Sequence, residues 1–281
     1  NLLRSEALKA VVARTSALPP VPRIYEKLCQ ELQSPEGAVA NVGRIIESDP
    51  AMVAKILQLT NSAFFGLRQH VSSATQAVSL LGLEIIRALV LMTGVFNSLR
   101  DLKLPAEFSL DLCWLHSMMV GVYAQSISRY EAANKVVISN SYTAGVLHDL
   151  GELVLASGYP REYSYTREYA RVNDCSTIES EQMVMGCTHA EIGAYLLGIW
   201  GLPNEIVEAV AYHHRPEDFI GTGFSPLVAV HAAEVIVDRR NKCGELPETT
   251  NTEAFLERIG KKGALENWES LCGAINVGEE L

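Results

Sequence analysis

The fold of this chain is decided around residues 83–96, which read LEIIRALVLMTGVF. Drawn as a helix, this stretch is apolar on nearly all sides, and a helix that is hydrophobic all round is buried in a protein core. It is too short for the roughly 18 consecutive apolar residues that a membrane span needs. We therefore expect residues 83–96 to form a buried helix that joins two lobes.

Proline-marked helix starts precede this stretch. Ser34-Pro35 and Asp49-Pro50 each combine a residue that caps a helix N-terminus with a proline at the first helical position. The second pair is followed by apolar residues at helical spacing, which mark one buried face: Met52, Val53, Ile56 and Leu57. The part of the chain before Leu83 is therefore expected to be a bundle of short helices.

The sequence after Lys103-Leu104-Pro105 has the same helical character. Helices are expected over residues 112–128, 139–155, 161–172, 176–185, 189–200, 205–213 and 226–237, and residues 252–281 are amphipathic and acidic. Strand signals are few, because no turn dipeptide such as Asn-Gly separates two alternating runs. The predicted fold class is all-α, with a boundary between two lobes near Pro105.

The composition restricts the kinds of partner. Of the 281 residues, 48% are hydrophobic and 20% are charged, which favours a folded chain over a disordered one. The net charge is −10 and basic residues form no large cluster, so nucleic acid is not expected as a partner. The six cysteines form no Cys-x-x-Cys pair, which favours a reducing compartment and hence the cytoplasm. No membrane segment is expected.

A conspicuous loop, NSAFFG, covers residues 61–66. Asn61 and Ser62 are expected to cap helix ends through side-chain hydrogen bonds, with Phe64 and Phe65 in the core. The alternative is that this loop forms a surface on which a partner docks.

Titratable side chains recur among apolar neighbours in the part of the chain after Pro105. They are His116, His148, Asp149, His189, His213, His214 and Glu234. Burying imidazoles and carboxylates is costly unless they are paired or bind a metal. Neutral imidazole and carboxylate together suit Fe, Mn, Ni or Zn. These residues therefore predict a site for one or two divalent transition-metal ions.

Ordinary structural roles stay open for the same residues. His213-His214 precedes Arg215-Pro216 and could cap a helix C-terminus. The whole group could also be a vestigial pocket whose histidines hydrogen-bond to one another or to water. His70 and His231 are interpreted as core or interface residues. A shared metal site requires His148 and His213 to lie close together in the folded chain.

Five sequence blocks carry a family resemblance. They are LPPVP at 18–22, IIESDP at 45–50, LTNSAFFG at 59–66, QAVSLLG at 76–82 and AGVLHDLG at 144–151. The first four together resemble the HDOD family, the HD-related output domains, and the resemblance covers roughly residues 16–238. The last block is also similar to the HD signature of metal-dependent phosphohydrolases.

The resemblance implies a two-lobed helical HDOD module that serves as the output domain of a two-component response regulator. Residues 1–17 would be a linker helix after a receiver domain, residues 18–104 the N-terminal helical lobe, and residues 105–281 an HD-like lobe with an extension after Thr252. The implied partners are an upstream receiver domain and an unidentified protein. Output would occur through protein contact, and no residue is assigned a catalytic role.

More distantly, the chain is similar to HD-GYP phosphodiesterases, whose pattern implies which residues ligate metal. His116 matches the first histidine of that pattern, and His148 with Asp149 matches its HD pair. The later histidines correspond to His189, His213 and His214, while Glu234 stands where an aspartate is usual.

Three departures from the HD-GYP pattern argue against hydrolysis. Glu152 stands where that pattern has a lysine, and a glutamate repels a phosphate that a lysine would attract. No Gly-Tyr-Pro tripeptide follows residues 213–217, and Arg215 stands where a glutamate is frequent. The resemblance therefore implies a retained metal pocket without hydrolysis. Two alternatives stay open: a divergent metal-dependent phosphohydrolase of nucleotides or cyclic dinucleotides, and a module that binds a nucleotide without turnover.

Overall fold

The computed structural model describes residues 8, 11, 22–33, 39–62, 65–67, 69–99, 102–241 and 252–275. All regular elements among these residues are helices, which confirms the predicted all-α class. Contacts group residues 22–99 into one compact unit and residues 102–274, with Leu8 and Val11, into a second. Most of the expected linker helix, Ser34-Pro35 and Phe64 lie outside the described residues, and the lobe limits at Leu104 and Pro105 stay a prediction.

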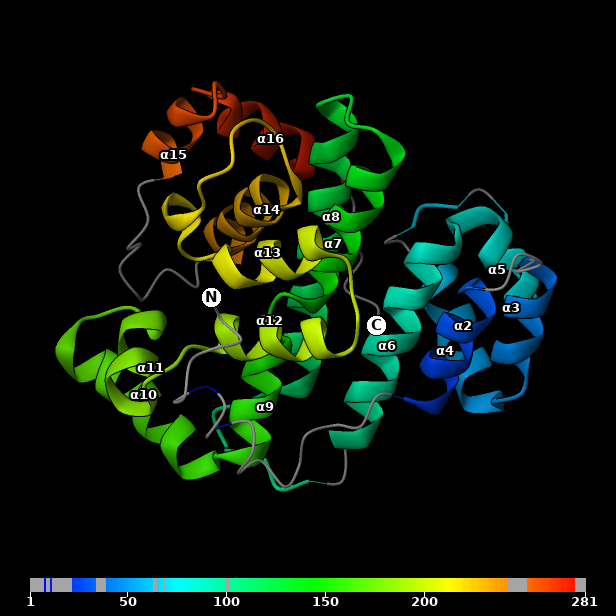
Figure 1. Cartoon of the computed structure of the whole chain (residues 1–281), viewed down its shortest axis with the longest axis horizontal. Coiled ribbons are helices and arrows are strands. Elements are labelled where there is room, and N and C mark those ends of the chain that lie inside the picture. Colours follow the sequence, from blue (N-terminus) through cyan, green and yellow to red (C-terminus); the bar gives the residue numbers. More distant parts are fainter. Residues whose placement is uncertain are drawn as a thin grey trace. The chain divides into compact units, whose positions relative to one another are not determined.

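The N-terminal unit is a bundle of five described helices (Figure 1). They are α2 (Arg23–Gln33), α3 (Val39–Glu47), α4 (Pro50–Thr60), α5 (Ala74–Leu81) and α6 (Leu83–Leu99). The carboxylate of Asp49 accepts hydrogen bonds from the backbone N–H groups of Ala51 and Met52, so this residue caps α4 as predicted. Ser73 caps α5 in the same way, through the N–H of Gln76.

Helix α6 is the apolar stretch 83–96 extended to Leu99. Its buried residues lie on nearly every side, as expected for a core helix, and it packs against α2, α4 and α5. A Cβ atom on Gly94 would lie 2.3 Å from Cγ of Pro22, so glycine permits the close approach of the chain before α2. The role of α6 in joining the two lobes stays a prediction.

The loop after α4 is held by Asn61. Its side-chain oxygen accepts the Val71 backbone N–H at 2.7 Å, and its amide donates to the Val71 carbonyl at 2.8 Å and to the Leu57 carbonyl at 2.9 Å. Ser62 donates to the Leu59 carbonyl. Asn61 and Ser62 therefore have the structural role that was expected of them, whereas Phe65 is only half-buried.

The C-terminal unit is built around α7 (Leu110–Tyr130), which packs along α8 (Lys135–Leu147) and α14 (Pro226–Asn241) (Figure 1). The other helices follow in the order α9 (Leu150–Gly158), α10 (Pro160–Asn173), α11 (Thr177–Met185), α12 (His189–Ile199), α13 (Asn204–Tyr212), the 3-10 turn η2 (Pro216–Asp218), α15 (Thr252–Arg258) and α16 (Ala264–Gly273). The contacts α8–α13 and α9–α12 bring together helices that are distant in sequence, and α13 also packs against its neighbours in the chain, α12 and α14.

The structure corrects one expected helix. Residues 139–155 were expected to be continuous, but α8 ends at Leu147 and α9 begins at Leu150. Asp149 leaves the helical conformation, with φ −93° and ψ 15°. Successive residues of a continuous helix point about 100° apart, so the break allows His148 and Asp149 to point toward the same place.

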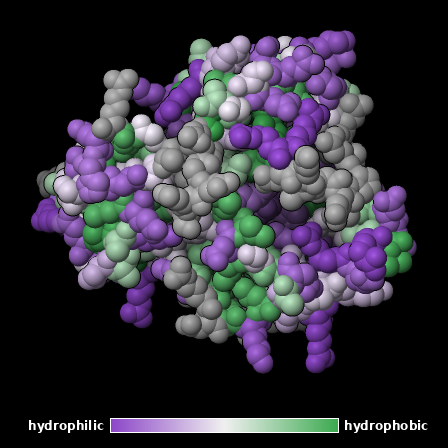
Figure 2. Space-filling model, turned by 180° about the vertical axis from the view of Figure 1, so that it is seen from behind, coloured by the Kyte–Doolittle hydropathy of each residue, from purple (hydrophilic) through white to green (hydrophobic). Residues whose placement is uncertain are grey.

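The face of the molecule in Figure 2 is largely polar where described residues form it. Figure 2 shows hydrophilic residues over much of the face that it presents, with hydrophobic residues in smaller patches between them. None of the described helices has both the length and the apolar character needed to cross a bilayer.

Candidate metal centre

Two helices of the C-terminal unit end on a histidine that points into its interior. His148 is the C-cap of α8 and His213 is the C-cap of α13, and both side chains are fully buried. The Nδ1–H of His148 donates to the Gly145 carbonyl at 2.7 Å, and the Nδ1–H of His213 donates to the Val210 carbonyl at 2.7 Å. Each ring thus satisfies a carbonyl of the last helical turn. In the neutral ring, Nε2 then carries the free lone pair.

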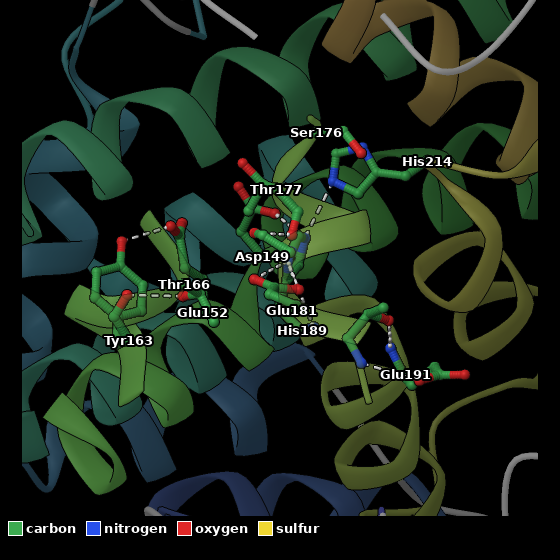
Figure 3. A network of polar contacts seen from close by, with 12 residues as sticks. Asp149, Glu152, Tyr163, Thr166, Ser176, Thr177, Glu181, His189, Glu191 and His214 are labelled. Atoms are coloured by element: carbon green, nitrogen blue, oxygen red, sulfur yellow. Dashed lines mark hydrogen bonds and ion pairs between the residues drawn. The ribbon is translucent and has the colours of Figure 1, made fainter. Parts of the chain in front are cut away.

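His189 enters the same interior from the first turn of α12. Thr188 and Glu191 form a capping box that fixes the start of this helix. The His189 ring donates through Nδ1 to Glu181, whose carboxylate oxygens both lie 2.9 Å away, and its backbone N–H donates to the same carboxylate at 2.8 Å. Figure 3 shows Glu181 of α11 beside the His189 ring. A carboxylate on the far nitrogen fixes the orientation of a metal-ligating histidine.

Asp149 lies between two sets of histidines. Its Oδ2 atom is 3.1 Å from Nε2 of His148 and 3.5 Å from Nε2 of His116. Its Oδ1 atom is 3.4 Å from Nε2 of His189 and 3.7 Å from Nε2 of His213. The two oxygens of one carboxylate therefore face two different pairs of imidazoles.

His116, His214 and Glu234 complete the cluster. Nε2 of His116 lies 3.2 Å from Nε2 of His148, and Nε2 of His214 lies 3.1 Å from Nε2 of His189. Oε1 of Glu234 is 3.5 Å from Nδ1 of His214 and 4.0 Å from Nε2 of His213. Two donor groups result: Asp149, His189, His213 and His214 form one, and His116, His148 and Glu234 form the other.

The donor atoms of the cluster fit a metal in both spacing and chemistry. Two atoms that each lie about 2.1 Å from a tetrahedral ion are about 3.4 Å apart, close to the separations around Asp149. Nε2 of His213 and Oε2 of Glu234 are buried without a hydrogen-bond partner. Because buried polar atoms are normally paired, these two atoms are suited to bind a positive ion.

A glycine allows the two halves of the cluster to approach. A Cβ atom on Gly151, in the first turn of α9, would lie 1.9 Å from the His189 carbonyl oxygen. Any side chain there would separate α9 from α12 and move Asp149 away from the His189 ring. The glycine of the HD block therefore has a direct steric role in the site.

Burial and charge shift the protonation of the cluster strongly. Burial lowers the pKa of His148, but Asp149 outweighs this effect and raises it to about 9. Burial raises the pKa of Asp149, but His148 holds it well below its usual range. Burial lowers the pKa of His213 and His214 well below the usual range, so these two rings are neutral. Metal ligation requires neutral imidazoles beside an ionised carboxylate, and His213, His214 and Asp149 are already in that state. Burial lowers the pKa of His189, but Glu181 and Asp149 outweigh this effect and raise it well above the usual range. His148 and His189 would therefore have to release a proton to bind a metal.

Glu152 lies beside the cluster in a setting of its own. Its carboxylate accepts the Tyr163 hydroxyl at 2.8 Å and pairs with Arg167 at 3.8 Å (Figure 3 shows Glu152 with Tyr163). Burial raises the pKa of Glu152, and the negative charge of Asp149 raises it further. The residue at the lysine position of HD-GYP enzymes is therefore an acidic group close enough to Asp149 to interact with it electrostatically.

Of the two histidines left out of the predicted site, His231 is buried behind the cluster and His70 is exposed. His231 donates through Nδ1 to the backbone carbonyl of His213 at 2.7 Å. Burial lowers the pKa of His231 to about 4. This residue therefore supports a cluster residue without sharing its donor atoms.

The structure brings all seven predicted site residues into one cluster, and the rings of His148 and His213 have centroids 5.1 Å apart. That they ligate a metal stays a prediction. Glu181 was missed by the sequence analysis. Glu181 precedes His189 by eight residues, and no sequence motif links the two. A glutamate is usually exposed, so its residue type did not indicate that it would be buried.

Comparison with protein families identifies one family. A family model described as the HDOD domain matches residues 18–216. A curated relative from Treponema pallidum (strain Nichols), named only as an uncharacterized protein, is 25% identical over 214 residues, or 75% of this chain. The chain spans 41% of the length of that relative.

Solved structures show the same fold. An HDOD domain protein of unknown function from Geobacter sulfurreducens is 22% identical, with a TM-score of 0.77 and coverage of 96% of both chains. A candidate phosphohydrolase from Shewanella amazonensis SB2B is 23% identical, with a TM-score of 0.75 and coverage of 96% of this chain and 94% of that one. A candidate metal-dependent phosphohydrolase from the same organism is 20% identical, with a TM-score of 0.63 and coverage of 95% and 96%.

Proposed function

The chain belongs to the HDOD family, and on that premise we propose that it is a regulatory output module that binds divalent transition metal without hydrolysing phosphodiesters. The observation that carries the metal assignment is the pair of orphaned donor atoms in the cluster, Nε2 of His213 and Oε2 of Glu234. Both are buried, and both lie in a cluster in which the Nδ1 atoms of His148, His189 and His213 are already hydrogen-bonded. Such an arrangement is costly for a vestigial pocket, because an unsatisfied buried polar atom costs about 1–3 kcal/mol.

The residues that would hold the metal fall into the two donor groups on either side of Asp149. Their mixture of imidazole nitrogen and carboxylate oxygen suits Fe, Mn, Ni or Zn, as one ion or two. When bound, such an ion supplies Lewis-acid chemistry to a water or a phosphate oxygen. His148, His213 and His189 orient their Nε2 atoms through backbone carbonyls and Glu181, and Asp149 holds the negative charge.

Glu152 supports the absence of hydrolysis. Its carboxylate is fixed by the hydroxyl of Tyr163 and by Arg167, beside Asp149. A phosphodiester that approached the cluster would meet a second acidic group where HD-GYP enzymes offer a cation. Arg167 is engaged by Glu152 and also donates to Thr177 at 3.2 Å, so its charge is already in use.

The proposed output is protein contact, controlled by a receiver domain upstream. The much greater length of the Treponema relative is compatible with an HDOD module joined to further segments. A cytoplasmic location is part of the proposal, because the five described cysteines are free thiols.

The second candidate is a divergent metal-dependent phosphohydrolase, and a specific observation favours it. The cluster has donors on both sides of one bridging-type carboxylate, an arrangement with room for the two-ion chemistry of phosphoester cleavage. Two structures of similar fold also carry phosphohydrolase names.

The experiment that separates the candidates is an activity assay on metal-loaded protein. The protein is loaded with Mn²⁺, Fe²⁺, Ni²⁺ or Zn²⁺ and offered bis(p-nitrophenyl) phosphate and cyclic dinucleotides, beside a His148→Ala/Asp149→Ala double variant. We expect no hydrolysis above that of the double variant. Turnover by the loaded wild type that the double variant lacks would establish the enzyme. Calorimetric binding of the nucleotide without product would identify the nucleotide-binding alternative.

A further inference from the structure

The C-terminal helix α15 is tied to the metal-type cluster through His231. His231 of α14 donates through Nδ1 to the His213 carbonyl, which can only accept, so in the neutral ring its Nε2 atom is an acceptor. That atom lies 3.1 Å from the hydroxyl of Thr252, the first residue of α15. A continuous chain of two hydrogen bonds therefore connects α15 to the backbone of a cluster histidine. His231 and Thr252 are both buried.

A second connection runs from the other end of α15. The guanidinium of Arg258 donates to three backbone carbonyls: Glu217 at 2.8 Å, Phe219 at 2.9 Å and Pro216 at 3.0 Å. These residues form the turn that directly follows His213 and His214. The Arg258 side chain therefore fixes the backbone of residues 216–219, which follow the cluster histidines in the chain.

Helix α15 is itself anchored by apolar contacts. Phe255 and Leu256 are buried, and the Phe255 ring meets the His231 ring edge-on with centroids 5.8 Å apart. The chain beyond α15 is held on α7, where Glu131 accepts hydrogen bonds from Lys261 and from the indole of Trp268. Residues 252–274 thus pack on the C-terminal unit itself.

We propose that α15 is a clamp on the metal-binding histidines, so that its docking and the metal occupancy of the cluster strengthen each other. The clamp fixes the backbone of His213 through His231 and the turn after His214 through Arg258. With α15 docked, the Nε2 atoms of these two histidines are held in place before metal arrives. This inference rests on the proposed metal binding. It adds that binding or loss of metal would change how firmly α15 is docked on the C-terminal unit.

Reciprocity follows from thermodynamic linkage. If docking of α15 raises the affinity for metal by some factor, metal must favour docking of α15 by the same factor. Residues that orient metal ligands typically change affinity by about 10- to 100-fold. We therefore expect metal to slow hydrogen exchange of the α15 backbone amides by at least about tenfold.

The test uses the full chain with Zn²⁺ and two changes at opposite ends of α15. Thr252→Val removes the hydroxyl and keeps the shape of the side chain. Arg258→Ala removes the guanidinium from an exposed position, where the fold is least at risk. For both variants we expect Zn²⁺ to dissociate about tenfold faster than from the wild type. Hydrogen exchange of residues 213–219 should accelerate in both.

Matched controls are available on the same helix. Thr252→Ser keeps the hydroxyl, and Glu253→Ala changes an exposed side chain of α15. Both should release Zn²⁺ at the wild-type rate. Thermal unfolding in chelator shows whether each variant is folded. Unchanged Zn²⁺ dissociation in folded Thr252→Val and Arg258→Ala would overturn the clamp.

Failure of the clamp and failure of metal binding give different results. A wild type that binds Zn²⁺, with α15 exchange equal in the metal-bound and chelator-treated states, overturns the clamp alone. A wild type that takes up no Zn²⁺ overturns the proposed function, and with it the coupling that the clamp requires.

Discussion

The two units of this protein bury different kinds of side chain. Among the described residues of the N-terminal unit, the buried side chains are almost all apolar, and polar groups such as Asp49 and Asn61 serve helix ends and loops. The C-terminal unit buries His148, His189, His213, Glu181 and Glu234 within one cluster. The first pattern stabilises a fold, whereas the second is costly for stability unless the buried groups gain a partner.

This difference indicates where function lies. Buried side-chain atoms without a hydrogen-bond partner occur among the described residues of both units, for example Nε of Arg87 and Oγ1 of Thr93 in the N-terminal unit. Those of His213 and Glu234 differ because they lie within a group of titratable donors that suits a metal ion. On their outer sides, the rings of His148, His213 and His189 hydrogen-bond to Gly145, Val210 and Glu181. These bonds turn the inner Nε2 atoms toward Asp149 and toward the neighbouring rings. The predictions below test this contrast between the two units.

The largest effect is expected from Asp149→Asn. In metal-containing protein, loss of the carboxylate between the two donor groups should reduce the metal content to background. In chelator, the free energy of unfolding should fall by roughly 3–5 kcal/mol, because His148 loses its buried anionic partner. Elemental analysis and urea denaturation measure the two effects. Asp111→Asn, at an exposed position of α7, is the control, and equal metal content in the two variants would contradict the site.

The next effect concerns pH in chelator-treated protein. The pKa of His231 is lowered to about 4 by burial, against an ordinary value near 6.5. Between these values the unfolded chain binds a proton that the folded chain does not, so stability falls as the pH drops from about 6.5 toward 4. This residue contributes a slope of up to about 1.4 kcal/mol per pH unit.

His231→Asn checks that slope, because asparagine keeps a donor for the His213 carbonyl and does not titrate. Urea denaturation between pH 4.5 and pH 6.5 should give a shallower dependence of stability on pH in the variant. The same slope in both proteins would show that His231 is not the buried neutral group described above.

A smaller loss of metal affinity is expected from Glu181→Gln. The amide supports the His189 ring less well than the carboxylate, so affinity should fall by about 10- to 100-fold while the fold is kept. Titration against a metal-sensitive dye gives the affinity. Glu191→Gln is the matched control. Glu191 belongs to the capping box of α12, the helix that begins with His189, but its carboxylate accepts from the Thr188 backbone and not from the His189 ring. Equal losses in both variants would assign the effect to the helix start.

The smallest effect is expected in the N-terminal unit. Asp49→Ala removes the cap of α4 and should lower the free energy of unfolding by about 1 kcal/mol. Metal content should not change. A fall in metal content with this variant would break the contrast between the two units.

The sequence predicted those features that depend on local rules or on family motifs. The cap at Asp49-Pro50 follows from side-chain chemistry within four residues. The cluster residues were selected as titratable groups among apolar neighbours, and the family resemblance supported their grouping into one site, because a single histidine such as His116 carries no local signal of a shared site. The break between α8 and α9 was missed, since the apolar pattern runs through it unchanged. Just after the break, Gly151 lies against the His189 carbonyl, a contact between helices that the periodicity does not encode.

The parts that support the cluster were also hidden from the sequence. Glu181 of α11 accepts a hydrogen bond from the His189 ring at the start of α12. Arg258 donates hydrogen bonds to a turn some forty residues earlier in the chain. Neither contact has a periodicity or motif, because both arise only when α11, α12 and α15 are placed in the fold. His231 was interpreted as an ordinary buried residue, and its hydrogen bond to the His213 carbonyl shows what it supports.

The central claim is that the buried cluster is a working metal site. Elemental analysis by mass spectrometry, on protein purified without a histidine tag and without chelator, tests it most directly. The account predicts one or two Fe, Mn, Ni or Zn ions per chain in the wild type and background levels in His148→Ala. A wild type that contains no transition metal, and takes up none when reloaded with each of the four ions, would contradict it.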